Sequence, residues 1–213
     1  MIGATPVTVR GYVFGVLFLA AFVGRAIAGG GLLGIDHVVT PDDKGIWKRS
    51  TESAILNVLI GGEIAGAVWE GGETTLGKTF WQAIDSSAIG AVSSEALKHV
   101  FTRSRPTQSN DPNEWFQGSH HYSFPSGEVT TATAIVTPFM LEYGRDYPAM
   151  YALGALPAYI GIARIKAQAH WQTDILGGAA LGVATGYFAH TRDNPLILGV
   201  LPHGFMVGLR KQF

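Results

Sequence analysis

Apolar residues along the chain gather in six long stretches that are separated by polar connections. The stretches are rich in Ala, Gly, Leu and Ile, and none of them alternates strictly between apolar and polar positions. This pattern favours helices over strands. We therefore predict an all-α fold, a bundle of about six helices. The stretches run approximately over Gly11–Ile35, Ser53–Trp69, Phe80–Leu97, Val129–Leu141, Tyr147–Ala163 and Ile175–His190.

Proline and glycine interrupt this pattern. Pro138 and Pro157 fall inside apolar stretches, where proline kinks or ends a helix. The longest connection, Phe101–Ser123, contains Pro, Asn and Gly and is typical of a structured loop. Near the end of the chain, apolar residues flank Pro202-His203-Gly204, which predicts either a short β-hairpin with Gly in its turn or a frayed tail.

The beginning of the chain has the character of a signal or membrane-anchoring segment. Arg10 precedes an apolar run from Tyr12 to Val23, and Ala26-Ile27-Ala28 resembles a signal-peptidase site. The later stretches are shorter than the roughly 20 apolar residues of a spanning helix, or they carry Glu or Asp. We expect three parts: a signal-like or anchoring segment over 1–35, a helical bundle over 36–191 and a tail over 192–213.

Composition and charge narrow the possible functions. Hydrophobic residues make up 47% of the 213 positions and the net charge is −1, so nothing points to a disordered chain or to nucleic acid as a partner. The chain has no Cys, which excludes disulfides, a thiol nucleophile and cysteine metal sites. No spacing of His, Asp and Glu argues for a metal site.

The first of three polar clusters is the densest positive patch, Lys98–Pro106. Lys98 ends an apolar helical stretch, and Arg105 precedes Pro106, which favours extended backbone at Arg105. A Lys charge and an Arg fork could thus reach one anion. A solvated helix end, with cations at the negative end of its dipole, is the alternative interpretation.

The second cluster is Ser123–Glu128, which leads directly into an apolar helix. Ser126 is a candidate N-cap, and Gly127 allows an oxyanion to approach the backbone. Free N–H groups at a helix start form an anion site. An ordinary capped helix would have the same sequence.

The third cluster runs from Arg164 to Asp174. His170 and Asp174 stand at i and i+4, so on a helix they share a face. An Asp bonded to one imidazole nitrogen leaves the other as a nucleophile. A surface His–Asp pair is the alternative. In a bundle of antiparallel helices all three clusters fall at the same end, and together they supply what phosphoryl transfer needs.

The three clusters together resemble the motifs of the type 2 phosphatidic acid phosphatase superfamily, which shares its site with vanadium haloperoxidases. Three motifs in order at the right spacing are a strong signal, and they span about residues 80–190. The first motif is matched by Lys98, Arg105 and Pro106, the second in part by Pro125, Ser126 and Gly127, and the third by Arg164, His170 and Asp174.

The resemblance implies a role for each matched residue. His170 would attack phosphorus and Asp174 would orient it and stabilise its charge. The phosphate-binding residues would be Lys98, Arg105, Ser126, Gly127 and Arg164. No metal and no other cofactor is required, because fixed cations neutralise the phosphate.

One position departs from the family. The second motif ends in a His that protonates the leaving group, and this chain has Glu128 there. Glu128 as the catalytic acid predicts activity on the acid side of neutrality. Alternatively His120 or His121 supplies the proton, the leaving group needs little protonation, or the protein binds lipid phosphate and turns over poorly.

These observations lead to one preferred function. We predict a phosphatase that acts through a phosphohistidine. Its substrate is a phosphomonoester or diphosphate, either of a lipid or as a small phosphoester. We expect it in the bacterial cell envelope, either in the inner membrane with its site facing the periplasm or in the periplasm after signal cleavage. A non-catalytic lipid-phosphate-binding membrane protein and a vanadate-dependent haloperoxidase are the alternatives. The sequence leaves the oligomeric state open.

Overall fold

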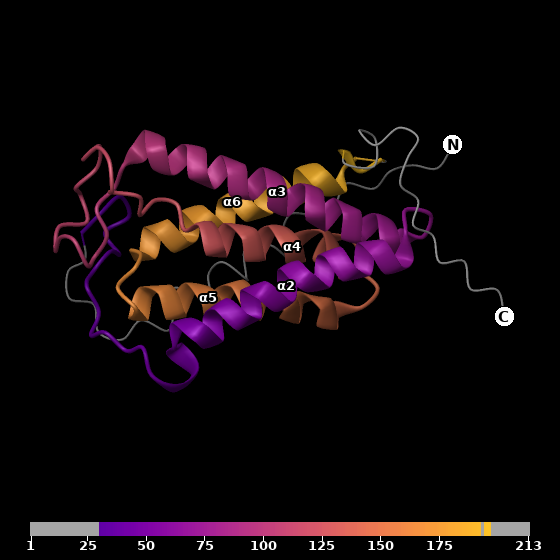
Figure 1. Ribbon diagram of the computed structural model, residues 1–213, viewed down its shortest axis with the longest axis horizontal. Coiled ribbons are helices and arrows are strands. Elements are labelled where there is room, and N and C mark those ends of the chain that lie inside the picture. The colour runs from indigo at the N-terminus through magenta and orange to yellow at the C-terminus, as the bar shows by residue number, and fades with distance from the viewer. Residues whose placement is uncertain (1–29, 193, 197–213) are drawn as a thin grey trace.

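Five α-helices lie along one long axis in the computed structural model, which describes residues 30–192 and 194–196 (Figure 1). The predicted all-α fold is confirmed, because the described residues form no strand beyond a single bridge between Gly30 and Asp36. The signal-like run and the predicted C-terminal hairpin lie outside the described residues. The helices are α2 (Arg49–Glu70), α3 (Thr75–Phe101), α4 (Gly127–Tyr143), α5 (Ala155–Lys166) and α6 (Gln172–His190), with the short 3-10 helices η2 (Gly45–Trp47) and η3 (Pro148–Gly154).

The two internal prolines act differently. α4 continues past Pro138 to Tyr143, so this proline does not end the helix. The stretch that contains Pro157 does break: it forms η3 first, and α5 then begins at Ala155. Pro157 thus lies in the first turn of α5, where its missing N–H has no intrahelical partner to lose.

α4 is the central helix of the bundle and contacts α2, α3, α5, α6 and η3. Its closest neighbour is α6, and glycines permit that approach: a Cβ on Gly178 would lie 2.6 Å from the Ser126 carbonyl oxygen, and one on Gly182 would lie 2.6 Å from the Thr130 carbonyl oxygen. The buried core around this contact consists of Val129, Ala132, Ile160 and Ile175. This packing holds the start of α4 directly against the start of α6, where the second and third clusters lie.

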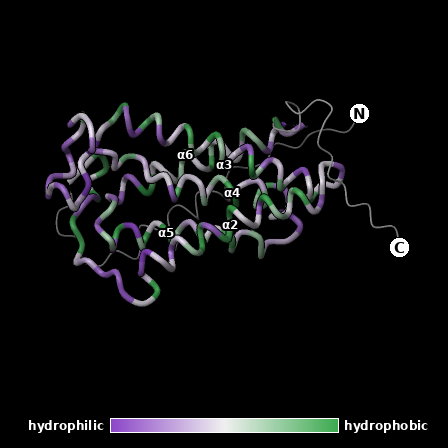
Figure 2. The backbone as a smooth tube through the Cα atoms, viewed as in Figure 1, coloured by the Kyte–Doolittle hydropathy of each residue, from purple (hydrophilic) through white to green (hydrophobic). Residues whose placement is uncertain are grey.

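Hydrophilic residues gather in the loops at both ends of the bundle, and the helices between the loops carry most of the hydrophobic residues (Figure 2). The loop of residues 102–126 and the segment before η2 gather at one end, beside the start of α4 (Figure 1). On the flank, α2 is the one helix of the described residues that is long and apolar enough to cross a membrane. Only 17% of its most apolar window is buried, and Val58, Val68 and Trp69 are strongly exposed.

Candidate active site

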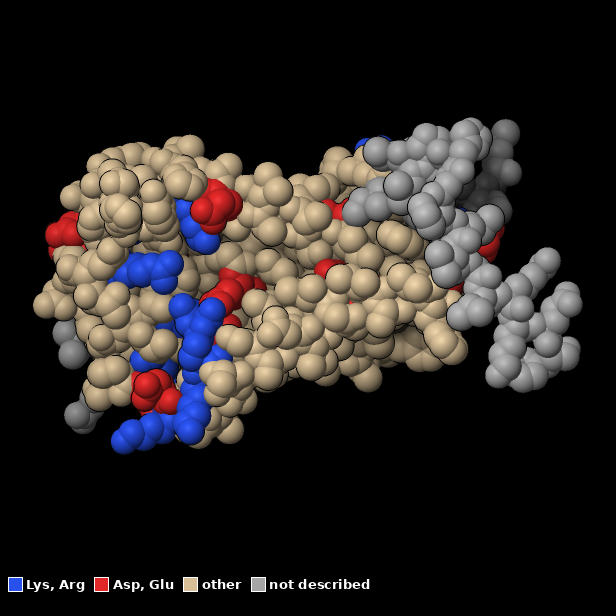
Figure 3. All heavy atoms as spheres, in the orientation of Figure 1, with Lys and Arg blue, Asp and Glu red and all other residues tan. Residues whose placement is uncertain are grey.

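The three polar clusters meet in one cleft at the loop end of the bundle, as predicted. The cleft has a volume of about 470 Å³, and Lys and Arg side chains gather on this half of the molecule (Figure 3). It is lined by Arg49, Ala91, Ser94, Glu95, Lys98, Arg105, Gly127, Glu128, Thr131, Arg164 and His170. Of the predicted site residues, only Ser126 and Asp174 are absent from this lining, and both are fully buried.

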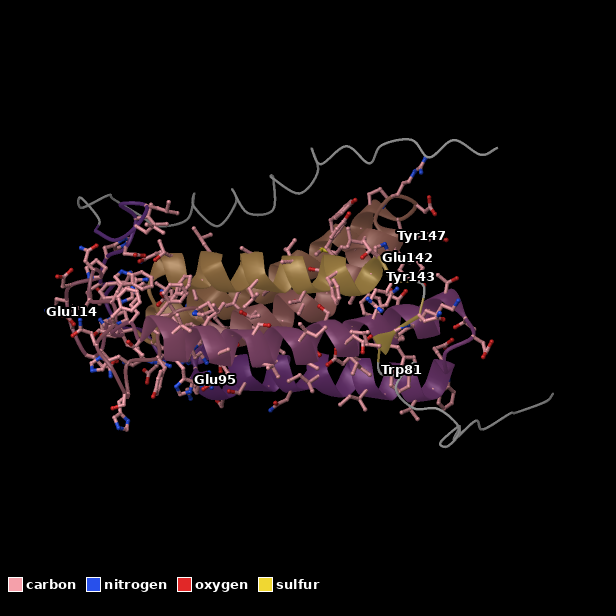
Figure 4. All side chains as sticks on the ribbon, turned by 90° about the horizontal axis from the view of Figure 1, so that it is seen from above. Trp81, Glu95, Glu114, Glu142, Tyr143 and Tyr147 are labelled. Carbon is pink, nitrogen blue, oxygen red and sulfur yellow. The ribbon has the colours of Figure 1, made fainter. Side chains whose placement is uncertain are left out.

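Lys98 reaches the cleft from the last turn of α3. Its Nζ atom lies 3.2 Å from Oε2 of Glu95, one turn earlier, and this ion pair holds the side chain. Glu95 lies on α3 towards the loop end, away from Trp81 and Glu142 at the other end (Figure 4). The hydrogen bond and charge of Lys98 lower the pKa of Glu95. A Cβ on Gly127 would lie 3.1 Å from Lys98 Nζ, so glycine leaves room for this cation at the start of α4.

Arg105 enters the cleft from the loop and lies outside any helix, as its position before proline predicts. Its two terminal nitrogens donate to the carbonyl oxygens of Ala169, at 3.2 Å, and Tyr122, at 3.1 Å. These bonds tie the guanidinium to the segments that carry His170 and Ser123. The positive charge is therefore held in place without a carboxylate bonded to it among the described residues.

Ser126 occupies the N-cap position of α4, but its side chain makes no capping hydrogen bond. Its hydroxyl is buried and has no partner among the described residues. The Ser126 backbone N–H donates to the carbonyl oxygen of Asp174 at 3.0 Å, which joins the starts of α4 and α6. The hydroxyl and the free N–H groups of the first turn are thus available to an anion.

His170 and Asp174 are adjacent, although they do not share a helix. α6 begins at Gln172, so His170 precedes the helix, and the expected common helix face is wrong. Nδ1 of His170 lies 2.8 Å from the carbonyl oxygen of Ser123 and 3.6 Å from Oδ2 of Asp174. Because a carbonyl oxygen only accepts, Nδ1 carries the proton. The lone pair is therefore on Nε2, the arrangement that a nucleophilic imidazole needs.

Burial and charge keep this imidazole neutral. Burial lowers the pKa of His170, Asp174 acts against it, and the charges of Arg105 and Arg164 lower the pKa further. Burial alone would raise the pKa of Asp174, but its interaction with His170, the charge of Arg103 and a hydrogen bond from Ser123 lower it. A neutral ring thus lies beside an ionised carboxylate.

Glu128 takes part in a four-residue group that we call the cleft cluster: Arg49, Glu52, Glu128 and Arg164. Its carboxylate lies between two guanidiniums, with Oε2 2.7 Å from Nε of Arg164 and Oε1 paired with Arg49. Arg49 also lies 2.5 Å from Oε2 of the buried Glu52. Arg164 is therefore paired with a carboxylate in this structure, whereas its predicted role is to bind phosphate.

The sequence analysis did not identify Arg49 and Glu52. They lie just before the second apolar stretch, in the first turn of α2, and only their i and i+3 spacing connects them in the sequence. His120 and His121, the alternative proton donors, do not line the cleft, and Nδ1 of His121 lies 2.9 Å from the Ser104 hydroxyl. The described residues also contain no group of three or more His, Asp or Glu placed to hold a metal ion.

The family profile of the PAP2 superfamily matches residues 80–196, more than half of the chain and all three motifs. The chain belongs to the PAP2 superfamily. This PAP2 protein is 33% identical over 114 residues to a lipid A 1-phosphatase of Porphyromonas gingivalis, covering 51% of this chain and 23% of that relative. It is 32% identical over 98 residues to a lipid A 1-phosphatase of Rhizobium etli, covering 44% of this chain and 40% of the relative.

The match is thus limited to part of each relative. The chain spans less than half the length of both, and the match to each covers about half of this chain. No solved structure matches the chain significantly.

Proposed function

We propose that this PAP2 protein is a phosphatase, a phosphoric ester hydrolase that cleaves a phosphomonoester or diphosphate of a lipid through a phosphohistidine. The observation that carries the proposal is the state of His170. Its Nδ1 donates to the Ser123 carbonyl, and its pKa is lowered by burial. A neutral imidazole with a free Nε2 lone pair therefore lies in a cleft that Lys98 and Arg105 also line.

The reaction takes two displacements at phosphorus. Nε2 of His170 attacks, the P–O bond to the leaving group breaks, and the phosphoryl group is transferred to the imidazole. Lys98, Arg105 and Arg164 neutralise the phosphoryl oxygens, and the Ser126 hydroxyl donates to one of them. Water then attacks phosphorus, the P–N bond breaks, and inorganic phosphate and neutral His170 are regenerated.

Glu128 occupies the position of the family's proton donor. It can protonate a leaving alkoxide only as a carboxylic acid, and phosphate must first replace its carboxylate on Arg164. An alkyl phosphomonoester, whose alkoxide leaving group needs a proton, therefore depends on this donor. A diphosphate, whose leaving group is itself a phosphate, depends less on this proton.

A lipid substrate is supported from two directions. Both curated relatives carry the name lipid A 1-phosphatase. In this chain the exposed apolar flank of α2 starts at Arg49, which lines the cleft. We infer that α2 contacts the lipid phase and that the cleft lies at the level of the head groups. The protein then belongs to the bacterial envelope, with its cleft facing the periplasm.

Phosphate release from purified protein tests the proposal. The substrates are a phosphatidic acid, a lipid A-type phospholipid, an isoprenoid diphosphate and p-nitrophenyl phosphate, assayed between pH 4 and 9 beside His170→Ala. Release that is lost in His170→Ala supports the phosphatase. If no substrate gives His170-dependent release while phosphate still protects the fold against heat, the chain is a lipid-phosphate-binding protein. Bromide oxidation after vanadate loading would instead indicate a haloperoxidase.

A further inference from the structure

A second group of charged residues lies entirely inside the protein, and none of its members lines the cleft. Arg103, in the loop after α3, has a side chain with no exposed surface. One terminal nitrogen lies 2.7 Å from Oδ2 of Asp36 and the other 2.6 Å from Oδ1 of Asp174, both fully buried side chains. We call Asp36, Arg103 and Asp174 the buried cluster.

The guanidinium of Arg103 is held on every side. It donates to the Pro112 carbonyl oxygen from Nε, at 3.1 Å, and from a terminal nitrogen, at 2.6 Å, and to the Thr173 hydroxyl at 2.8 Å. Trp115 stacks over it, with the ring centroid 4.3 Å from the guanidinium carbon. Arg103 therefore cannot reach a phosphate in the cleft, unlike Lys98.

Asp36 reaches this cluster from the segment before η2, outside the residues that match the PAP2 profile. Its Oδ1 accepts the Thr173 backbone N–H at 2.8 Å, and its Oδ2 accepts the Thr173 hydroxyl at 2.7 Å. These bonds cap the first turn of α6 from outside. Asp36 is also paired with Arg103, and Asp174 follows Thr173 in the first turn of α6. The bonds of Asp36 therefore fix the position of Arg103 relative to Asp174.

Asp174 connects the buried cluster to the candidate nucleophile. Its Oδ2 accepts the Ser123 hydroxyl at 2.5 Å and the Trp171 backbone N–H at 2.8 Å, and it lies 3.6 Å from Nδ1 of His170. Its Oδ1 faces Arg103. Without Arg103, one oxygen of a buried carboxylate would lose its charged partner and the carboxylate could turn.

We propose that Arg103 and Asp36 are positioning residues for the nucleophile: Arg103 fixes the Asp174 carboxylate beside His170, and Asp36 fixes Arg103. This inference rests on the proposed role of His170. Two carboxylates and one guanidinium give the buried cluster a net charge of −1, which complements the positive charge that develops on the imidazole when Nε2 takes the phosphoryl group.

The charge arrangement makes a prediction that a merely structural role does not. Arg103→Gln removes a positive charge near His170, raises the pKa of His170 and moves the acidic limb of kcat/KM to higher pH. Asp36→Asn removes a negative charge and moves the limb to lower pH. The other charged groups near the ring, Asp174 on α6, Arg105 in the loop, Arg164 on α5, Glu128 on α4 and Lys98 on α3, stay unchanged in both variants.

Kinetics of the full chain in detergent provide the first test. We expect Arg103→Gln to lower kcat about 100-fold with KM changed less than threefold, and Arg103→Lys to recover part of the loss. Arg145→Gln, an exposed arginine at the opposite end, and Asp42→Asn, in the same segment as Asp36, serve as controls with unchanged activity. A folded Arg103→Gln with kcat within threefold of wild type overturns the proposal. The proposal is also overturned if the acidic limbs of kcat/KM in Arg103→Gln and Asp36→Asn move in the same direction or do not move.

A measurement without substrate separates this proposal from the proposed function. The ¹⁵N shifts of the His170 ring report its tautomer and pKa directly, with His170→Ala as the assignment reference. We expect an Nδ1–H ring in wild type and opposite pKa changes in Arg103→Gln and Asp36→Asn. If the pKa of His170 changes in this way while no phosphate is released, the positioning role of Arg103 and Asp36 is supported and the proposed phosphatase function is wrong. If Arg103→Gln does not fold, Arg103→Lys and Asp36→Asn give the same readout, and an unchanged His170 pKa in both refutes the proposal.

Discussion

The cleft cluster and the buried cluster use the same ingredients, arginines paired with carboxylates, in opposite surroundings. In the cleft cluster the exposed fraction of the side chain is 55% for Arg49, 21% for Glu128 and 11% for Arg164, and Glu52 is buried at 1%. In the buried cluster every side chain is fully buried and Arg103 is bonded to two carboxylates, a hydroxyl and a carbonyl. Asp174 of the buried cluster lies beside His170, and three members of the cleft cluster line the same cleft as His170.

The difference in burial predicts a difference in function. The Arg164–Glu128 pair borders the cleft, with 11% and 21% of the two side chains exposed, so a phosphate oxygen that enters the cleft can replace Glu128 on Arg164. A buried pair that loses one partner leaves an uncompensated charge, which costs about 3–5 kcal/mol. The cleft cluster is therefore suited to exchange partners during turnover, and the buried cluster to keep one geometry throughout.

The largest expected effect is at Arg164. Arg164→Gln removes a cation that neutralises the phosphoryl oxygens, and we expect kcat/KM to fall by about 10³-fold. Steady-state phosphate release measures this, with Arg145→Gln as the matched exposed control. A loss below tenfold would mean that Glu128 remains on Arg164 during the reaction.

The next effect concerns Glu128. Glu128→His restores the residue of the family motif and should raise turnover of a phosphatidic acid at neutral pH about tenfold or more. The same change should affect an isoprenoid diphosphate much less, because its leaving group needs less protonation. Equal effects on both substrates, or a lower rate on the phosphatidic acid, would count against Glu128 as the proton donor.

The pH dependence of kcat/KM tests the state of the nucleophile. The imidazole must be neutral to attack, and its pKa is lowered from the ordinary value of 6.5 by burial and by Arg105 and Arg164. Activity should therefore persist below pH 6.5 and fall only as the pH drops through the lowered pKa. A limb centred above pH 6.5 on a substrate with a good leaving group would show that His170 is not held neutral.

The smallest effect is expected at Arg49. Its side chain is half exposed and already paired with Glu52 and Glu128, so Arg49→Gln should change kcat less than threefold. A larger loss, measured beside Arg164→Gln, would show that Arg49 also binds the phosphoryl group.

Most of the fold was predictable because each helix carries its own local signal. Apolar stretches placed four of the five described helices to within a few residues at most ends. The motif spacings identified six of the eleven residues that line the cleft. The η3 break before Pro157 and the continuation past Pro138 depend on which turn of the helix holds the proline, and periodicity does not give that.

The supporting contacts were not predictable, since they join residues far apart in the chain. Asp36 and Arg103 are 67 positions apart, and nothing in either sequence context indicates their pairing. The His170–Asp174 spacing suggested a shared helix face, whereas α6 begins at Gln172 and the Ser123 carbonyl fixes the ring. The sequence predicted that Arg164 binds phosphate, but only the structure shows that Arg164 is paired with the carboxylate of Glu128.

Trapping the covalent intermediate shows whether His170 is the nucleophile. Wild-type protein is mixed with ³²P-labelled substrate and quenched in base within milliseconds, and the labelled residue is identified by peptide mapping. We expect an acid-labile, base-stable phosphoryl group on His170, absent from His170→Ala and present in Arg145→Gln. Phosphate release by wild type with no label on His170 at any quench time, or full release by His170→Ala, would contradict it.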